Sequence, residues 1–156
     1  MAVKSPFDVF GTEPTLEQTG IRIDYGSYYF LIGRAGGANT KFSDAVRAKF
    51  RPYQRALDLG EMDDKVSNRL TAEAFAETVV LGWGTPDPIE GGTAEENEGR
   101  FGAGLMIGQD GAAIPFSVDA VKAMLTALPD LTMDLIKESQ KIANFRKVVA
   151  SDDAKN

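Results

Sequence analysis

The alternation of hydrophobic and polar positions near the start of the chain predicts a β-hairpin over residues 20–33. Two isoleucines alternate with charged residues in segment 21–24, which is the pattern of a half-buried strand. Asp-Tyr-Gly-Ser at 24–27 supplies turn chemistry, and the aromatic and branched residues of segment 28–32 suit a pleated surface. Because one hairpin alone is only marginally stable, we expect helices to cover it.

Beyond the hairpin, the hydrophobic period lengthens and predicts a helix. Asn39 or Thr40 is a suitable N-cap, Pro52 should interrupt the helix, and Gly60 should mark its end. The apolar positions recur at steps of three and four, which places them on one stripe: Phe42, Val46, Phe50, Tyr53 and Leu57.

The rest of the chain is predicted to be helical on both sides of a long irregular segment. A helix over 62–81 should end at Gly82-Trp83-Gly84, and Ser117 should cap a later helix that Pro129 stops. Asp130 should open the last helix. The segment 84–113 between them is rich in glycine and acidic residues, and it predicts a long loop insertion with one short strand at Leu105-Met106-Ile107.

These elements predict an α+β fold that is mainly α, with an N-terminal β-hairpin followed by a bundle of about four helices. The 156 residues suit one domain with a core of its own. We expect an irregular N-terminal arm over 1–18, a single α-rich domain over 19–148 that carries the 84–113 insertion, and a frayed tail over 149–156.

Composition narrows the chemistry, because the chain contains neither cysteine nor histidine. Disulfides, thiolate nucleophiles, thiolate metal sites and Ser–His or Cys–His catalysis are therefore excluded within this chain. We expect no catalytic residue, no cofactor and no metal site, and hence a protein that is not an enzyme. A hydrolase that uses a pair of carboxylates stays an alternative, although no spacing nominates a particular pair.

The charge balance disfavours nucleic acid as a partner, since the chain carries a net charge of −6. Segment 41–55 is an exception, with five basic side chains and one acidic side chain. We interpret it as the solvated face of a helix rather than an RNA site, because no aromatic stacking platform accompanies it. A docking surface for an acidic protein is the intermediate alternative. No apolar stretch approaches the ~20 residues that span a bilayer, and the N-terminus lacks a signal-peptide core, so we expect no membrane partner and a cytoplasmic protein.

Two local motifs invite a ligand interpretation. The run Gly33-Arg34-Ala35-Gly36-Gly37 lies between a predicted strand and helix, where phosphate loops occur, but it lacks the Gly-Lys-Ser/Thr ending. The acidic run at 95–98 lacks the spacing of an EF-hand loop. A flexible turn and a solvated loop are the preferred interpretations.

The order of short motifs resembles the tail assembly chaperones of long-tailed, siphovirus-like bacteriophages over about residues 20–148. The strand leads to a basic residue and an Asn that opens a helix, followed by a Gly-Trp segment, an Ile-Pro cap and a helix that opens with Pro-Asp. The segments that carry the resemblance are 23–39, Phe50-Arg51-Pro52-Tyr53, 79–84, Ile114-Pro115-Phe116-Ser117, Leu128-Pro129-Asp130-Leu131 and Ala143-Asn144-Phe145-Arg146. Two features depart from that pattern: Phe116 stands where a Tyr is expected, and residues 85–110 are much longer than the usual loop.

The resemblance implies a binding protein of the host cytoplasm, without an active site, that binds the tape measure protein, helps to recruit the tail tube protein and self-associates along its client. A minor structural virion protein of the tail or head–tail junction is the alternative. Arg47, Arg51, Tyr53 and Trp83 are the expected partner contacts, because Arg, Tyr and Trp favour interfaces. The competing interpretation places Tyr53 and Trp83 in the core and leaves both arginines solvated.

Overall fold

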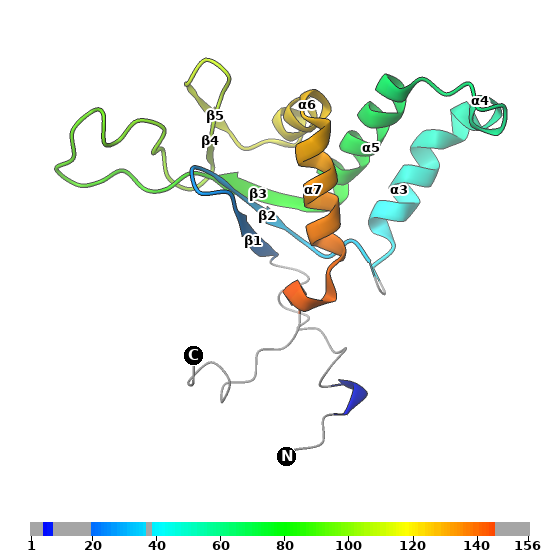
Figure 1. The fold of residues 1–156 in the computed structure, drawn as a ribbon, viewed down its shortest axis with the longest axis horizontal. Helices are drawn as coiled ribbons and strands as arrows, with labels where there is room; N and C mark the ends of the chain where they lie inside the picture. The colour runs from blue at the N-terminus through cyan, green and yellow to red at the C-terminus, as the bar shows by residue number, and fades with distance from the viewer. Residues whose placement is uncertain (1–4, 8–19, 37–38, 146–156) are drawn as a thin grey trace.

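The computed structural model describes residues 5–7, 20–36 and 39–145 (Figure 1). The predicted arm, apart from residues 5–7, and the predicted tail lie outside the described residues. The named elements follow in the order β1 (Ile21–Asp24), β2 (Tyr29–Ile32), α3 (Lys41–Phe50), η1 (Arg51–Tyr53), α4 (Gln54–Asp58), α5 (Asp64–Thr78), β3 (Val80–Gly84), β4 (Leu105–Ile107), β5 (Ala113–Pro115), α6 (Val118–Ala127), α7 (Pro129–Gln140) and η2 (Ile142–Phe145). The fold is α+β and mainly helical, with about four substantial helices and a small hairpin near the N-terminus, as the sequence predicts.

The predicted hairpin is present and gains a third strand. Strands β1, β2 and β3 form an antiparallel sheet in that order, with Phe30 of β2 opposite Trp83 of β3. Gly26 adopts a φ of +90° in the β1–β2 turn, and its N–H donates to Oδ1 of Asp24 at 2.7 Å. The prediction that Gly82-Trp83-Gly84 only ends a helix was wrong, because these residues pair with β2 instead.

Glycine at position 84 has a steric reason. A Cβ at this position would collide with the ring and hydroxyl of Tyr29 on the neighbouring strand. The Tyr29 ring can therefore lie across the backbone of β3, while the Arg22 guanidinium covers it at 3.7 Å from the ring centroid. Tyr29 is consequently buried although it points to the opposite face from Phe30.

Helix α3 runs against α5, and the rings of Phe42 and Phe75 meet edge to face with centroids 5.4 Å apart. The predicted break at Pro52 is confirmed, since residues 51–53 form a 3₁₀ turn before the short helix α4. The predicted apolar stripe extends too far, because Leu57 on α4 is exposed rather than packed against the core.

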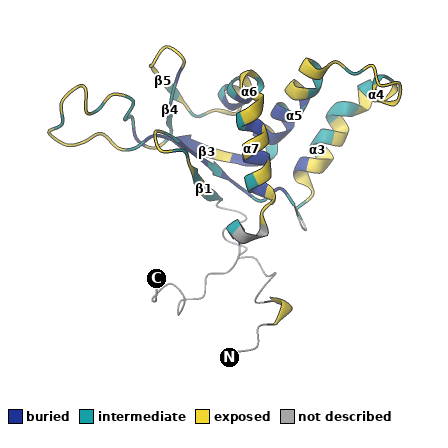
Figure 2. Ribbon diagram, viewed as in Figure 1, coloured by how far each residue is buried: buried dark blue, intermediate teal, exposed yellow. Residues whose placement is uncertain are grey.

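Helices α5, α6 and α7 pack together and carry the apolar core with the buried side of the sheet (Figures 1 and 2). The predicted cap of α6 is confirmed: the Ser117 side chain accepts from the N–H of Ala120 at 3.0 Å. Pro129 starts α7, where its missing N–H costs no helical hydrogen bond. The Thr132 hydroxyl donates to the carbonyl of Leu125 at 2.7 Å, which fixes the corner between α6 and α7.

The segment 84–113 is less irregular than predicted. It contains the predicted strand β4, and this strand pairs with β5 as a second hairpin that the sequence did not indicate. Residues 85–103 form the loop that extends away from the helices (Figure 1). This loop has its own hydrogen bonds. The Asn97 side chain accepts a hydrogen bond from the N–H of Ile89 at 2.6 Å and donates one to the carbonyl of Ile89 at 3.2 Å.

Candidate partner-binding groove

An apolar groove lies between the β4–β5 hairpin and helix α6. One wall comes from Ile107, Gly108 and Ile114 of the hairpin, and Gln109 continues it toward the turn. The other wall is a stripe of α6 at helical spacing and the residue that follows the helix: Ala120, Ala123, Met124, Ala127 and Leu128. The hollow measures about 660 Å³, which is room for several side chains rather than one. Leu128 is 48% exposed and forms an accessible lip.

The groove continues toward the first hairpin. A second hollow shares Ile107, Met124 and Leu128 with the first and adds Tyr28 and Leu131. Aliphatic, thioether and aromatic surfaces therefore form one channel that crosses from the β4–β5 hairpin to the start of α7. Because methionine is flexible and polarizable, Met124 at the junction can adapt to differently shaped side chains.

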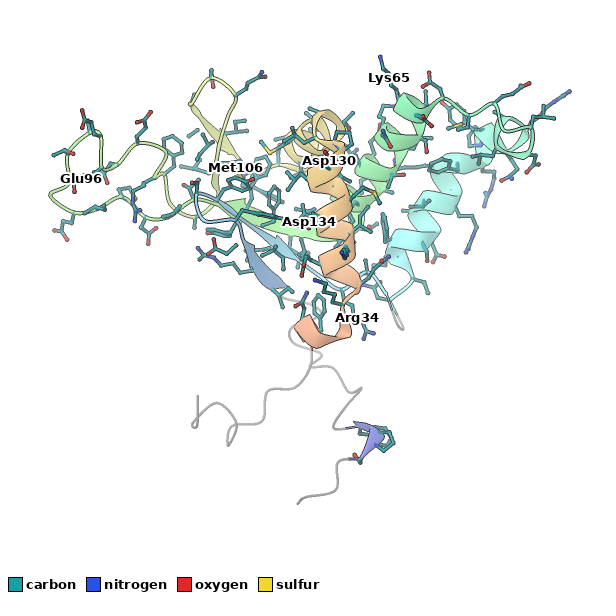
Figure 3. The ribbon with its side chains drawn as sticks, viewed as in Figure 1. Arg34, Lys65, Glu96, Met106, Asp130 and Asp134 are labelled. Carbon is teal, nitrogen blue, oxygen red and sulfur yellow. The ribbon has the colours of Figure 1, made fainter. Side chains whose placement is uncertain are left out.

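The walls of the groove are held by the core beneath them. Phe116 stands between β5 and α6, and its ring meets the Trp83 ring edge to face at 5.8 Å. The Phe116 N–H also donates to the carbonyl of Gly104 at 2.9 Å. Met106 of β4 is 2% exposed and belongs to the same core (Figure 3). The groove is thus a preformed feature of the fold, as binding sites commonly are.

Three carboxylates are close in sequence to residues that line the groove. Asp110 follows Gln109 in the β4–β5 turn, Asp119 precedes Ala120 on α6, and Asp130 lies two residues after Leu128 at the start of α7, where it lines a separate hollow (Figure 3). All three residues are exposed. Lys122, the lysine of α6, is directed elsewhere, because its Nζ lies 2.8 Å from Glu77 of α5. The lining of the groove itself is apolar apart from Gln109.

The Tyr25 hydroxyl joins the first hairpin to α7. It donates to Oδ2 of Asp134 at 2.5 Å, and the Tyr25 ring stacks on Tyr28 with centroids 5.3 Å apart. Two causes raise the pKa of the Tyr25 hydroxyl well above its usual range: partial burial, which is the larger, and the hydrogen bond to Asp134. Tyr25 stays protonated as a donor and so holds Tyr28 at the end of the groove.

The structure separates the four partner contacts proposed from sequence. Arg47 and Arg51 are exposed on α3 and η1, and Tyr53 is half-buried at the end of η1. None of these three lines the groove. Trp83 is 1% exposed in the core, as the competing interpretation expects, and its indole N–H has no hydrogen-bond partner among the described residues.

Part of the basic segment 41–55 is engaged within the fold. Lys49 lies between Glu73 and Glu77 of α5, with Nζ 3.6 and 3.0 Å from their carboxylates. Arg47 pairs with Asp44 on its own helix at 3.3 Å. The Glu77 carboxylate accepts hydrogen bonds from Lys122 and Lys49, and it thereby links α3, α5 and α6. These hydrogen bonds also lower the pKa of Glu77.

Backbone groups of the two motifs that invited a ligand interpretation make hydrogen bonds within the fold. The N–H groups of Gly33 and Ala35 donate to the carbonyls of Val79 and Ser139 at 2.9 and 3.0 Å, and are therefore not directed at a phosphate. In the acidic loop, the Glu96 N–H bonds the Thr93 hydroxyl at 3.1 Å.

Across the described ranges, acidic side chains form no group of three that could hold a metal ion. A shallow hollow beside the loop contains Glu96 and Glu98, both exposed. In the same ranges, every helix is too short or too polar to cross a bilayer.

The groove itself was not predicted from the sequence. Its signal was present as the small-residue stripe on α6, where three alanines and Met124 recur at helical spacing at the edge of the core-facing side. In the sequence alone, the alanines are explained by their high helix propensity. Their role as a wall of the groove becomes visible only when the β4–β5 hairpin lies beside α6.

Comparison with known protein families gives a match over most of the chain. Residues 37–156, which is 120 of the 156 residues, match the family described as YdaY prophage protein. The match begins before α3 and includes the groove, but it leaves out the β1–β2 hairpin. Neither curated proteins nor solved structures gave a significant match. This chain belongs to the YdaY prophage protein family.

Proposed function

We propose that this protein is a phage tail assembly chaperone that binds helical segments of the tape measure protein and assists tail tube assembly. The observation that carries the proposal is the apolar groove between β4–β5 and α6, which is open to solvent and lined by side chains that suit an apolar partner. A binding role of this kind needs no catalytic group.

The groove favours a helix as its occupant. An amphipathic helix presents a stripe of apolar side chains at steps of three and four, and a groove that receives such a stripe is a recurring mode of recognition. The alanines of α6 leave space for a second helix to approach closely, and Leu128 and Ile114 can pack between its side chains. Long, largely helical phage proteins such as the tape measure protein offer many such stripes.

Membership of a prophage protein family supports a phage context. The order of motifs that resembles tail assembly chaperones supports the more specific role. The absence of cysteine and histidine from the chain agrees with a binding protein rather than with the common classes of enzyme.

The test is co-expression with the tape measure protein of the same operon, followed by size-exclusion chromatography with light scattering. We expect a large soluble complex, and insoluble tape measure protein when it is expressed alone. Ala123→Arg places a long charged side chain in the groove from an exposed position and should abolish the complex. Ala48→Arg, at an exposed position of α3, is the matched control and should leave the complex intact. Separate elution with unchanged tape measure solubility would contradict the proposal.

A minor structural virion protein of the tail or head–tail junction is the second candidate. The observation in its favour is the projecting loop 85–103, which is folded by its own hydrogen bonds and could contact a neighbouring subunit (Figure 1). Mass spectrometry of purified phage particles distinguishes the two functions. A structural protein is retained in stoichiometric amounts, whereas a chaperone is absent.

A further inference from the structure

Strand β1 is the outer strand of the first sheet and leaves one edge open (Figure 1). It pairs with β2 on one side and with no other strand of the described residues. The unpaired backbone groups of such an edge are a template for a further strand. Ile21 and Ile23 of β1 are only half-buried, although Ile32 and Phe30 opposite them on β2 are fully buried. The apolar face of the sheet is therefore incompletely covered at the β1 edge.

The hydrogen-bond pattern of the hairpin fixes which residues of β1 face outward. The Tyr25 N–H donates to the carbonyl of Tyr28 at 2.9 Å, so these two residues form a hydrogen-bonded pair. Such pairs alternate with non-hydrogen-bonded pairs along an antiparallel ladder. Ile23 consequently bonds to β2, whereas the backbone N–H and C=O groups of Arg22 and Asp24 point to the open edge. A strand added at this edge must bond to Arg22 and Asp24.

The two outward-facing residues carry opposite charges. The side chains of Arg22 and Asp24 are 52% and 54% exposed, and Nη2 of Arg22 lies 3.5 Å from Oδ2 of Asp24. An antiparallel second copy of β1 can bond to this edge with Arg22 opposite Asp24, in both directions. A shift by two residues either way places Arg22 opposite Arg22 or Asp24 opposite Asp24. Facing opposite charges stabilise a strand pair and facing like charges destabilise it, so the edge is complementary to itself in the first alignment.

We propose that two copies of this protein pair through β1 and form a dimer with one continuous six-stranded antiparallel sheet. The two-fold axis passes beside Ile23, so that Arg22 of each copy faces Asp24 of the other. On the apolar face, Ile23 meets Ile23 of the second copy, and Ile21 lies opposite Tyr25. The same strand is used on both sides, so the interface is isologous and closes at two copies.

Helix α7, which the Tyr25–Asp134 bond places beside the hairpin, carries charges of both signs. Glu138 pairs with Lys141 at 2.6 Å. The charged residues of this helix and its C-cap are Asp130, Asp134, Lys137, Glu138 and Lys141. Because acidic and basic residues are interspersed, two copies of α7 on either side of the axis present no block of like charge to each other.

This inference goes beyond the proposed function, because it concerns the protein without a client. No residue of β1 lines the groove or its continuation, so the dimer keeps both grooves open. The strand also lies outside the residues that match the family. Failure of tape measure binding would reject the proposed function and leave the dimer unaffected.

Sedimentation velocity of the purified protein over a range of concentrations tests the pairing. We expect the mass of the wild-type protein to rise with concentration from one chain to two and no further. Arg22→Asp and Asp24→Arg each place like charges in facing positions, and each should weaken dimerisation by about tenfold or more. Arg55→Asp and Asp58→Arg make the same reversals at exposed positions of α4 and should retain wild-type dimerisation.

Combining the two reversals should restore the dimer. The double variant with Arg22→Asp and Asp24→Arg again faces unlike charges, and a mixture of the two single variants should form a 1:1 dimer for the same reason. Circular dichroism establishes that each variant is folded. A wild-type protein that is monomeric at every concentration overturns the proposal. A folded double variant that stays monomeric, or dimers that survive both single reversals, also overturn it.

A cysteine cross-link tests the alignment itself, since the chain has no cysteine of its own. Facing residues of a non-hydrogen-bonded pair have Cα atoms about 4.5 Å apart, which suits a disulfide. Oxidised Ile23→Cys should therefore run as a covalent dimer on a non-reducing gel. Ile21→Cys, on the same face, is the control and should stay uncross-linked, because residue 21 faces residue 25 and not itself. A cross-link through Ile21→Cys instead of Ile23→Cys would reject this alignment.

Discussion

The hydroxyl of Tyr25 in the β1–β2 turn donates to the carboxylate of Asp134 on α7, and so connects two residues that are 109 positions apart. This bond ties the hairpin to the last long helix. It also fixes the Tyr25 ring, which stacks on Tyr28 at one end of the groove. The family match covers α7 but not the hairpin, so the bond crosses the boundary of the matched region.

Removal of this hydroxyl should weaken the attachment of the hairpin. We expect Tyr25→Phe to lower the free energy of unfolding by about 1 kcal/mol, since it deletes one hydrogen bond to a charged acceptor that stays hydrated. Urea denaturation followed by circular dichroism measures the change. Tyr53→Phe, at a half-buried tyrosine in η1, is the control. Equal effects of the two substitutions would show that the bond contributes nothing specific.

Trp83 is the single tryptophan of the chain and reports on the core directly. Because its ring is buried between Phe30 and Phe116, its fluorescence should be that of an apolar environment and should shift to longer wavelength on unfolding. Trp83→Ala should lower the free energy of unfolding by about 3–5 kcal/mol, because it leaves a cavity in the core. Trp83→Phe should cost much less, since it keeps an aromatic ring and removes an unpaired N–H. A solvent-like emission of the folded protein would instead place Trp83 at the surface.

Gly84 should tolerate no side chain while Tyr29 lies across it. Gly84→Ala should destabilise the protein by about 1–3 kcal/mol through overpacking against the ring. Adding Tyr29→Leu should recover part of the loss, because the smaller side chain vacates the space. Gly36→Ala is the control, since a Cβ there meets no atom within 4 Å. Thermal unfolding compares the variants, and equal losses at both glycines would contradict the steric account.

Acid should release the contact that Glu77 makes with Lys122 and Lys49. The folded pKa of Glu77 is lowered, first by the hydrogen bond from Lys122, so its unfolded form binds protons more readily than its folded form. Its contribution is therefore complete above the ordinary glutamate pKa of about 4.3 and is lost as pH falls through the lower folded value. Glu77→Gln should lower the free energy of unfolding by about 1 kcal/mol at pH 7 and should reduce the loss of stability that acid causes.

Urea unfolding at pH 7 and at pH 3 tests the linkage. Glu61→Gln, an exposed carboxylate outside this network, should leave the pH dependence unchanged. The same acid-induced loss in Glu77→Gln as in the wild-type protein would assign it to other carboxylates.

The sequence by itself determined the elements whose information is local. Alternation predicted the first hairpin, apolar spacing predicted the helices, Ser117 predicted a cap and Pro52 a break, because each depends on neighbours within about one turn. The tertiary structure decided the rest. Strand β3 exists through its partner β2, which lies far away in the chain, and its two glycines leave little periodicity. The β4–β5 hairpin is local, but strands of three residues are too short to show an alternation. The groove exists only where the hairpin and α6 meet. The burial of Trp83 was likewise set by its partner strand, since an isolated Gly-Trp-Gly suits a core or an interface and does not specify the strand that covers it.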